Sequence, residues 1–303
     1  MSSAASGATP APPVSGTTTH RGDSSSTAPP LPPGQHPTEK ILGKVREQLA
    51  KEQGQQGGPA PPLVVLIATG SLCPVHYDHV GIFTSAKNHL ERHHGCVVVG
   101  GLLSPSHDRY LRGKLGNKAI PAVHRSSSCL LLPPPASSSP FFTLVVPTCR
   151  VRICELAVQE SDWIGVDAWE MSQPDFVDFP QVARHLLRHL EGTEGLPRHR
   201  MRVFFLCGAD LALKCGLDFR RLSDVGVVVA GRLGESNEVL REKSLPEGIP
   251  VTKESRNELV YFPTEMQDIS STLIRERMAR GEGVDHLTYP QVVNYMQQHQ
   301  LIK

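Results

Sequence analysis

Residues 63–79 read LVVLIATGSLCPVHYDH, and this stretch decides the fold. The apolar run Leu63–Ala68 predicts a strand, and Gly70 lets the backbone turn sharply directly after it because glycine has no Cβ. A helical pattern then begins at about His79. A strand, a glycine turn and a helix in this order predict the first unit of a parallel sheet covered by helices.

The same alternation continues to the end of the chain. It predicts an α/β fold, a doubly wound Rossmann-like parallel sheet with helices on both faces, which binds ligands beyond the carboxyl ends of its strands. The expected strands are Leu63–Ala68, Cys96–Leu103, Trp163–Val166, Arg202–Leu206, Val225–Ala230 and Glu258–Phe262. The expected helices are His79–His93, Arg152–Glu160, Gln181–Glu191, Glu238–Lys243, Ser271–Arg280 and Pro290–His299.

The 303 residues divide into two parts of unlike composition. Met1–Pro37 is almost wholly Ser, Thr, Pro, Ala and Gly, which predicts a disordered N-terminal tail. Apolar residues at helical spacing over Ile41–Leu49 predict a short appended helix, and Gly54–Pro62 reads as a second linker. The predicted domains are therefore 1–62, the tail with its helix, and 63–303, the folded domain.

One segment of the folded domain breaks the pattern. Residues 126–150 are rich in Ser, Leu and Pro, and the three consecutive prolines cannot lie inside a helix. Yet Pro121–Arg125 predicts the start of a helix and Arg152–Glu160 its continuation. We expect a low-complexity insertion at 126–150, with an error in the gene prediction as the alternative.

Composition excludes several classes of protein. Lys and Arg number 31 against 30 for Asp and Glu, so a strongly basic surface for nucleic acid is not expected. No apolar run is long enough to span a membrane. The cysteines number seven and none are spaced Cys-x-x-Cys, which predicts reduced, buried thiols in a reducing compartment, the cytoplasm or nucleus. The tail is poor in acidic residues, as transit peptides are, so an organelle address stays open.

Two histidines follow the glycine turn. His76 and His79 are three residues apart, so both imidazoles can face one anion at the start of the helix. There they can donate hydrogen bonds to phosphate oxygens and stabilise the charge that builds during attack at phosphorus. Two ordinary polar residues at a helix start are the alternative.

A second candidate anion site opens a late helix. Residues 269–275 read ISSTLIR. Ser270 or Ser271 can cap the helix, leaving hydroxyl and N–H groups for a polyphosphate, and Arg275 supplies a positive fork. Read alone, the segment is equally well a capped amphipathic helix with Ile274 in the core.

Together these motifs resemble those of the nicotinamide/nicotinate mononucleotide adenylyltransferases, a family of the His-x-x-His nucleotidyltransferase superfamily. The resemblance covers about Leu63 to Ile302. The family's Gly-Ser-Phe-x-Pro-x-(His/Thr)-x-x-His is matched by Gly70, Ser71, Leu72 in place of Phe, Pro74, His76 and His79. Further matches are Ser104–Tyr110, Ile120–Arg125, Val166–Glu170, Cys207–Asp210 and Ile269–Arg275.

The resemblance implies a reaction in NAD biosynthesis. ATP and nicotinamide or nicotinate mononucleotide would give NAD or deamido-NAD and pyrophosphate, with Mg²⁺ bound through the ATP phosphates. The implied catalytic residues are His76, His79 and Arg275. The implied ATP-binding residues are Gly70, Ser71, Leu72, His79, Ser271, Thr272, Leu273, Ile274 and Arg275.

The resemblance also implies a mononucleotide site, formed by Tyr110, Lys114, Trp169, Phe176, Gly208, Asp210 and Arg232. Trp169 and Phe176 are candidates to stack on the pyridine ring, with core packing as the alternative. Lys114 is our choice for the substrate phosphate, with Arg112 and Lys118 as rivals. The second tryptophan of relatives is absent over Leu211–Asp224, where Phe219 is the candidate substitute.

Other possibilities stay open at this point. The chain can instead be another His-x-x-His transferase, acting on phosphopantetheine or using CTP, or a catalytically silent nucleotide-binding relative. The sequence leaves open the choice between amide and acid mononucleotide, and homo-oligomeric assembly is implied only by relatives. His89, His93 and His94 are expected to be a solvated helix end and not a metal site, because no Cys or carboxylate lies nearby at ligand spacing.

Overall fold

The computed structural model describes residues 38–54, 58–115, 149–215, 224–232, 237–252, 258–267 and 269–302. The predicted tail over residues 1–37 and nearly all of the predicted insertion at 126–150 lie outside these ranges, as do Lys118 and Phe219. The domain boundaries therefore stay predictions.

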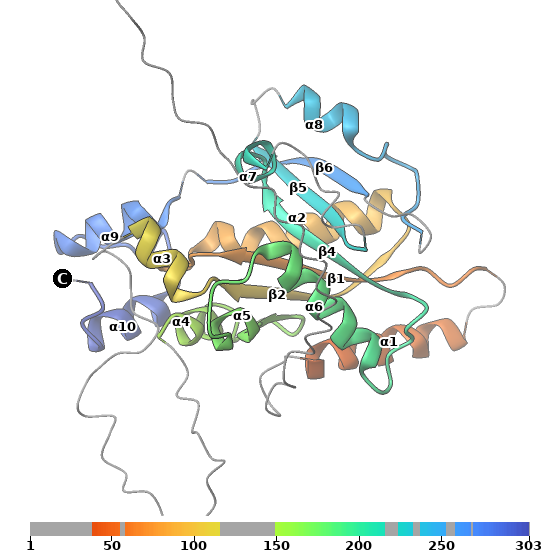
Figure 1. The fold of residues 1–303 in the computed structure, drawn as a ribbon, viewed down its shortest axis with the longest axis horizontal. Helices are drawn as coiled ribbons and strands as arrows, with labels where there is room; N and C mark the ends of the chain where they lie inside the picture. The colour runs from red at the N-terminus through yellow and green to blue at the C-terminus, as the bar shows by residue number, and fades with distance from the viewer. Residues whose placement is uncertain are drawn as a thin grey trace, which may run out of the picture. The chain divides into compact units, whose positions relative to one another are not determined.

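Six parallel strands form one sheet in the order β3-β2-β1-β4-β5-β6 (Figure 1). This is the strand order of the doubly wound Rossmann fold, so the predicted fold class is confirmed. Each expected strand is present, with its ends moved by one or two residues. The strands are β1 Leu63–Gly70, β2 Val97–Pro105, β3 Ile164–Val166, β4 Met201–Gly208, β5 Gly226–Arg232 and β6 Leu259–Thr264.

The helices match the expected ones less completely. The stretch after β2, for which no helix was predicted, forms a helix with Asp108 in its first turn and Lys114 in its last, charges that suit the helix dipole. The short helices after β3 and β4 were also not predicted. The helices are α1 Thr38–Gln53, α2 Tyr77–His93, α3 Asp108–Leu115, α4 Cys149–Ala157, α5 Trp169–Ser172, α6 Phe179–Gly192, α7 Ala209–Lys214, α8 Glu238–Lys243, α9 Ser271–Ala279 and α10 Pro290–Gln298.

Two neighbouring glycines of β2 show that helices pack on both faces of the sheet. A Cβ added at Gly100 would meet Ile41 of α1 at 2.7 Å, and one added at Gly101 would meet Phe83 of α2 at 2.8 Å. Successive strand residues point to opposite faces, so α1 and α2 lie on opposite sides. In the described part of the chain, no helix is both long and apolar enough to cross a membrane.

The carboxyl ends of the central strands lie level with one another. Gly70 at the end of β1 pairs with Pro105 at the end of β2, and Leu103 of β2 pairs with Val166 at the end of β3. The helices α9 and α10 lie beyond the carboxyl ends of β1 and β2 (Figure 1). The loops that follow these strands therefore meet the start of α9 at one edge of the sheet.

Candidate active site

The loop between β1 and α2 contains the glycine and histidine motif. Gly70 ends β1, and the residue of this loop with a left-handed backbone is Leu72, with φ 43°, so the structure shows no positive φ that would require glycine at position 70. A Cβ at Gly70 would meet only the Leu72 side chain, at 3.7 Å. The N–H of Ser106 donates to the Gly70 carbonyl oxygen at 2.8 Å, which joins this loop to the one after β2.

The two motif histidines lie side by side at the start of α2. Their ring centroids are 3.6 Å apart with 28° between the ring planes. The backbone N–H of His76 donates to Nδ1 of His79 at 3.1 Å. Because Nδ1 accepts this bond, the proton of a neutral His79 ring lies on Nε2, which can donate to a ligand.

Burial keeps both imidazoles neutral at pH 7. It lowers the pKa of His76 to about 4. Burial, and to a smaller extent the neighbouring His76, lowers the pKa of His79 well below its usual value. Nδ1 of His76 is buried and has no hydrogen-bond partner among the described residues. A polyphosphate at this loop would supply acceptors and favour the protonated rings.

The start of α9 contacts the histidine loop directly. Ser270 caps the helix by accepting from the Leu273 N–H at 3.1 Å, and Ser271 Oγ donates to the Pro74 carbonyl oxygen at 2.8 Å. Arg275 is buried, and its Nη1 donates to the Cys73 carbonyl oxygen at 2.5 Å. The predicted convergence of α9 on the histidine loop is therefore present.

The predicted ATP-binding residues of α9 differ in what they can offer a ligand. Nη2 of Arg275 donates to Thr272 Oγ1 at 3.0 Å, so two of the five guanidinium N–H donors are engaged by the protein. The N–H groups of Leu273 and Ile274 are already bonded to Ser270, and the Ile274 side chain is buried in the core. The structure therefore favours Thr272 and Arg275 over Leu273 and Ile274 for contact with ATP.

A buried arginine that sequence reasoning missed joins three segments of the site. Arg150 of α4 is fully buried. Its Nη1 donates to the carbonyl oxygens of Ser106 at 2.6 Å and Ser71 at 3.4 Å, and its Nη2 pairs with the Asp108 carboxylate and contacts Met171 Sδ at 3.0 Å. The predicted motif Ile120–Arg125 ends before the predicted insertion, whereas Arg150 lies at its far end, so no motif singled Arg150 out.

The predicted aromatic residues separate into two places. Trp169 is 5% exposed and stacks on His185, with centroids 3.9 Å apart and 10° between the rings. Tyr110 and Phe176 are exposed and stack on one another at 5.2 Å. Lys114 Nζ lies 5.8 Å from the centre of the Tyr110 ring, so these three predicted residues come together.

Two buried carboxyl groups follow β3, and sequence reasoning gave them no role. Glu170 Oε1 accepts from the His107 N–H at 2.8 Å, and burial raises its pKa to about 7. Asp167 accepts from the Trp169 N–H at 3.1 Å, and burial raises its pKa to about 6. Both were quoted as part of a motif, and their burial was the feature that the sequence did not reveal.

The remaining candidates follow β4 and β5. Gly208 is the N-cap of α7, so Asp210 lies in the first turn and does not cap this helix. Asp210 and Arg232 are both exposed. β4 is the neighbour of β1 in the sheet and β5 the next strand, so these residues lie on the side of β1 opposite to the Tyr110, Lys114 and Phe176 group.

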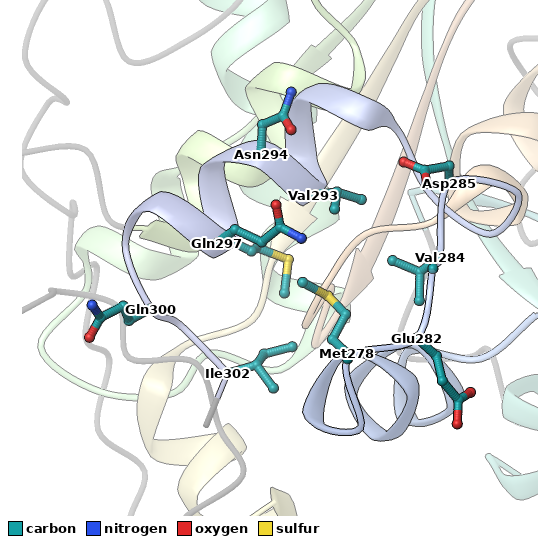
Figure 2. A pocket seen from close by; sticks show the side chains of 12 residues that line it. Met278, Glu282, Val284, Asp285, Val293, Asn294, Gln297, Gln300 and Ile302 are labelled. Carbon is teal, nitrogen blue, oxygen red and sulfur yellow. The ribbon is translucent and has the colours of Figure 1, made fainter.

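A cavity of about 510 Å³ lies between α9, α10 and the segment that joins them (Figure 2). None of the predicted site residues lines this cavity. Its lining residues are Met278, Gly281, Glu282, Gly283, Val284, Asp285, Val293, Asn294, Met296, Gln297, Gln300 and Ile302.

Comparisons with known proteins agree with the motifs. No protein-family model matches the chain. A nicotinamide/nicotinic acid mononucleotide adenylyltransferase of Arabidopsis thaliana is 30% identical over 247 residues, 78% of this chain and 89% of that protein. The protein of the same description from Oryza sativa subsp. japonica is 27% identical over 266 residues, 85% of this chain and 92% of that protein.

Among solved structures, the Plasmodium falciparum nicotinic acid mononucleotide adenylyltransferase complexed with APC aligns over 78% of this chain and 96% of that one, with TM-score 0.48 and 12% identity. Family membership rests on the Arabidopsis thaliana relative, which is 30% identical and matches over most of both chains. With the histidine pair and the α9 start in contact at the carboxyl edge of the sheet, the chain belongs to the nicotinamide/nicotinic acid mononucleotide adenylyltransferase family of nucleotidyltransferases.

Proposed function

We propose that this chain transfers the adenylyl group of ATP to nicotinamide or nicotinate mononucleotide. A phosphate oxygen of the mononucleotide attacks the α-phosphorus of ATP and forms a new P–O bond. The bond from that phosphorus to the bridging oxygen breaks, and pyrophosphate leaves with the electron pair. The products are NAD or deamido-NAD. The attacking phosphate is already ionised at pH 7, so the protein supplies position and charge stabilisation and needs no general base.

The observation that supports this proposal best is the contact of Arg275 with the histidine loop, 2.5 Å from Nη1 to the Cys73 carbonyl oxygen. It places a fixed positive charge beside His76 and His79, residues about 200 positions earlier in the chain. In the proposal, His79 donates from Nε2 to a phosphate oxygen, and His76 does so from its buried ring. Arg275, Ser271 and Thr272 hold the β and γ phosphates, and Gly70 and Ser71 give close backbone contacts.

Magnesium fits this site as an ion that ATP brings. Among the described residues, one cluster has three His, Cys, Asp or Glu side chains close enough to hold a metal ion, and it lies at His89. The histidine loop has no such cluster in the described ranges. Mg²⁺ is commonly held through substrate phosphates. When bound, it would neutralise part of the charge on the phosphates. The two histidines and Arg275 would bind the phosphate oxygens and stabilise the remaining negative charge.

The mononucleotide belongs, in the proposal, beside the stacked Tyr110 and Phe176. These two residues are 42% and 40% exposed and can meet a pyridine ring, whereas Trp169 is only 5% exposed. Lys114, close to the Tyr110 ring, is placed to bind the mononucleotide phosphate. We assign the mononucleotide three further residues, which lie on the other side of β1: Gly208, Asp210 and Arg232.

The deciding experiment supplies the full chain with MgATP and, separately, the amide mononucleotide, the acid mononucleotide and phosphopantetheine, and follows pyrophosphate release. We expect turnover with the pyridine mononucleotides alone. Turnover with phosphopantetheine alone would replace the proposal, and binding of ATP with no turnover on any acceptor would identify a silent relative. The ratio of the two pyridine rates determines the preferred substrate. Residues 63–303 as the active domain, homo-oligomeric assembly and a cytoplasmic or nuclear location stay predictions.

A further inference from the structure

Three metal-ligand side chains gather at the C-terminal end of α2. His89 and His93 lie one helical turn apart, and Glu247 comes to them from the segment after α8. One ligand atom from each of the three lies within 4.8 Å of the other two. Nδ1 of His93 is 3.5 Å from Oε2 of Glu247. The expectation of no carboxylate at ligand spacing is therefore wrong: the fold supplies one from 154 positions further along the chain.

Backbone hydrogen bonds fix the segment of Glu247 to the end of α2. The Gly248 N–H donates to the His93 carbonyl oxygen at 2.9 Å, and the Val251 N–H donates to the His94 carbonyl oxygen at 2.9 Å. Nδ1 of His94 is bonded to the Ile249 carbonyl oxygen, also at 2.9 Å. Glu247 is exposed, but its backbone is held beside the two histidines.

The chemistry of His89 suits a metal ligand. Its ring stacks on Phe262 of β6, with centroids 5.3 Å apart, and its Nε2 is buried without a hydrogen-bond partner among the described residues. A buried ring nitrogen with no hydrogen-bond partner is costly, and a metal ion is one kind of group that satisfies such a nitrogen.

We propose that His89, His93 and Glu247 bind one divalent transition-metal ion of the zinc type, with water as the fourth ligand. Two imidazoles and one carboxylate are a common donor set for Zn²⁺. Ligands of a tetrahedral zinc ion lie about 3.3 Å apart when its bonds are about 2.0–2.1 Å long. The 3.5 Å between His93 and Glu247 fits this spacing, and the widest separation need shorten by no more than about 1.5 Å.

This site is distinct from the candidate active site. His79 and His89 are ten residues apart on one helix, which corresponds to about 15 Å along the axis. The ion would join α2 to the segment between α8 and β6. The exposed Arg92 opposes a bound cation, and the Glu247 carboxylate offsets it.

The test uses the full chain, stripped with a chelator and then titrated with Zn²⁺ in the absence of ATP. The readouts are metal stoichiometry by elemental analysis, affinity by calorimetry and the thermal unfolding midpoint. We expect one tightly bound Zn²⁺ per chain and a midpoint that rises with Zn²⁺, since the ion binds the folded state preferentially. Co²⁺ in its place should give the absorption bands of a tetrahedral ion.

The diagnostic variant is Glu247→Gln, which changes an exposed side chain and leaves the fold intact. It should weaken Zn²⁺ binding roughly tenfold or more and remove most of the rise in midpoint. His93→Gln should do the same. The matched controls Glu242→Gln and His199→Gln, both exposed and outside the cluster, should behave like the wild type. Equal affinity in Glu247→Gln and wild type, or no Zn²⁺ bound by the wild type, would overturn the proposal.

Discussion

Nη1 of Arg150 lies 2.6 Å from the carbonyl oxygen of Ser106, which joins the start of α4 to the loop after β2. The same guanidinium reaches the Ser71 carbonyl oxygen in the histidine loop and the Asp108 carboxylate at the start of α3. One buried side chain therefore fixes the positions of the loops after β1 and β2 relative to each other. Arginine suits this task because its planar fork presents five donors and stays charged.

Arg150→Met is expected to lower the free energy of unfolding by about 3 kcal/mol, because it leaves the buried carbonyl groups and Asp108 without their partner. Arg150→Lys keeps the charge without the fork, so it should fold and lose activity through a higher KM for ATP. Chemical denaturation and steady-state kinetics measure the two effects. Arg152→Met, an exposed arginine of the same helix, is the matched control and should change stability by less than about 0.5 kcal/mol. An equal effect of both methionine variants would contradict this role.

His79→Ala is expected to lower kcat by roughly 10²–10³-fold while changing the KM for the mononucleotide little, because a hydrogen bond to a developing charge strengthens in the transition state. Single-turnover rates and binding of each substrate distinguish the two quantities. The exposed His286→Ala serves as control. If His79→Ala weakened binding and turnover equally, His79 would be a ground-state binding residue only.

Glu170→Gln is expected to change how stability depends on pH. The pKa of Glu170 in the folded protein, about 7, is above the ordinary value of 4.5. Below pH 4.5 both states are protonated. As the pH rises from there, the unfolded carboxyl ionises first, so wild-type stability is lost until the folded carboxyl ionises at about 7. The glutamine variant lacks this loss and should gain stability relative to wild type across that window.

Denaturation curves at pH 4.5, 6 and 7.5 test the Glu170 prediction. Asp167 is present in both proteins, but its charge is one of the causes that raise the Glu170 pKa, so part of its own titration remains in the difference. The exposed Glu160→Gln should give a flat difference from wild type. A flat difference for Glu170→Gln as well would mean that the pKa of Glu170 in the folded protein is not raised above its value in the unfolded chain.

Lys114→Gln is expected to raise the KM for the mononucleotide by roughly tenfold or more and to leave the KM for ATP unchanged, because a charge-assisted hydrogen bond to the substrate phosphate is lost. Arg112→Gln, which removes an exposed charge two residues away, and Lys118→Gln test the two rival residues in the same assay. The variant with the largest rise in KM identifies the phosphate ligand, and an unchanged KM in Lys114→Gln would reject our choice.

The sheet was predictable because its signal is local. Each strand is a short apolar run bounded by turn residues, and burial on both faces keeps such runs apolar, as in the fully buried stretch Leu63–Ile67 of β1. The helices α3, α5 and α7 have only eight, four and six residues, so each carries little helical period, and they were not predicted although α8, also of six residues, was. Packing against the strands, not propensity, decides whether such short segments are helical.

The site was predictable only in part, because its contacts join distant residues. The family resemblance placed Arg275 beside the histidine loop 202 positions from Cys73, which spacing alone could not do. No motif related Glu247 to His93, or Arg150 to Ser106. Side-chain burial was equally out of reach, and it is burial that sets the unusual pKa values of His76 and Glu170.

The last prediction compares two truncations that separate the tail from α1. Removing residues 1–37 should leave kcat, KM and the free energy of unfolding unchanged, because the composition of that segment gives it little to bury. Removing residues 1–54 also deletes α1, whose Ile41 and Val45 are 1% and 0% exposed. Each such side chain contributes about 1.5–3 kcal/mol when fully buried. We therefore expect this truncation to lower the free energy of unfolding several times more than an ordinary surface substitution does.

The longer truncation also removes polar contacts between α1 and the sheet. Lys40 Nζ donates to the carbonyl oxygens of Ser161 at 2.6 Å and Ile164 at 2.7 Å, and Glu52 pairs with Arg200 at 2.7 Å. Denaturation and activity assays on both truncated chains measure the effect. A large loss of activity on removing residues 1–37 would show that the tail takes part in function, whereas equal stability of the two truncations would show that α1 is not part of the folding unit. We expect the shorter truncation to be as stable as the full chain and the longer one to be less stable, because side chains of α1 cover one face of β2. The folding unit would then begin at α1, before β1.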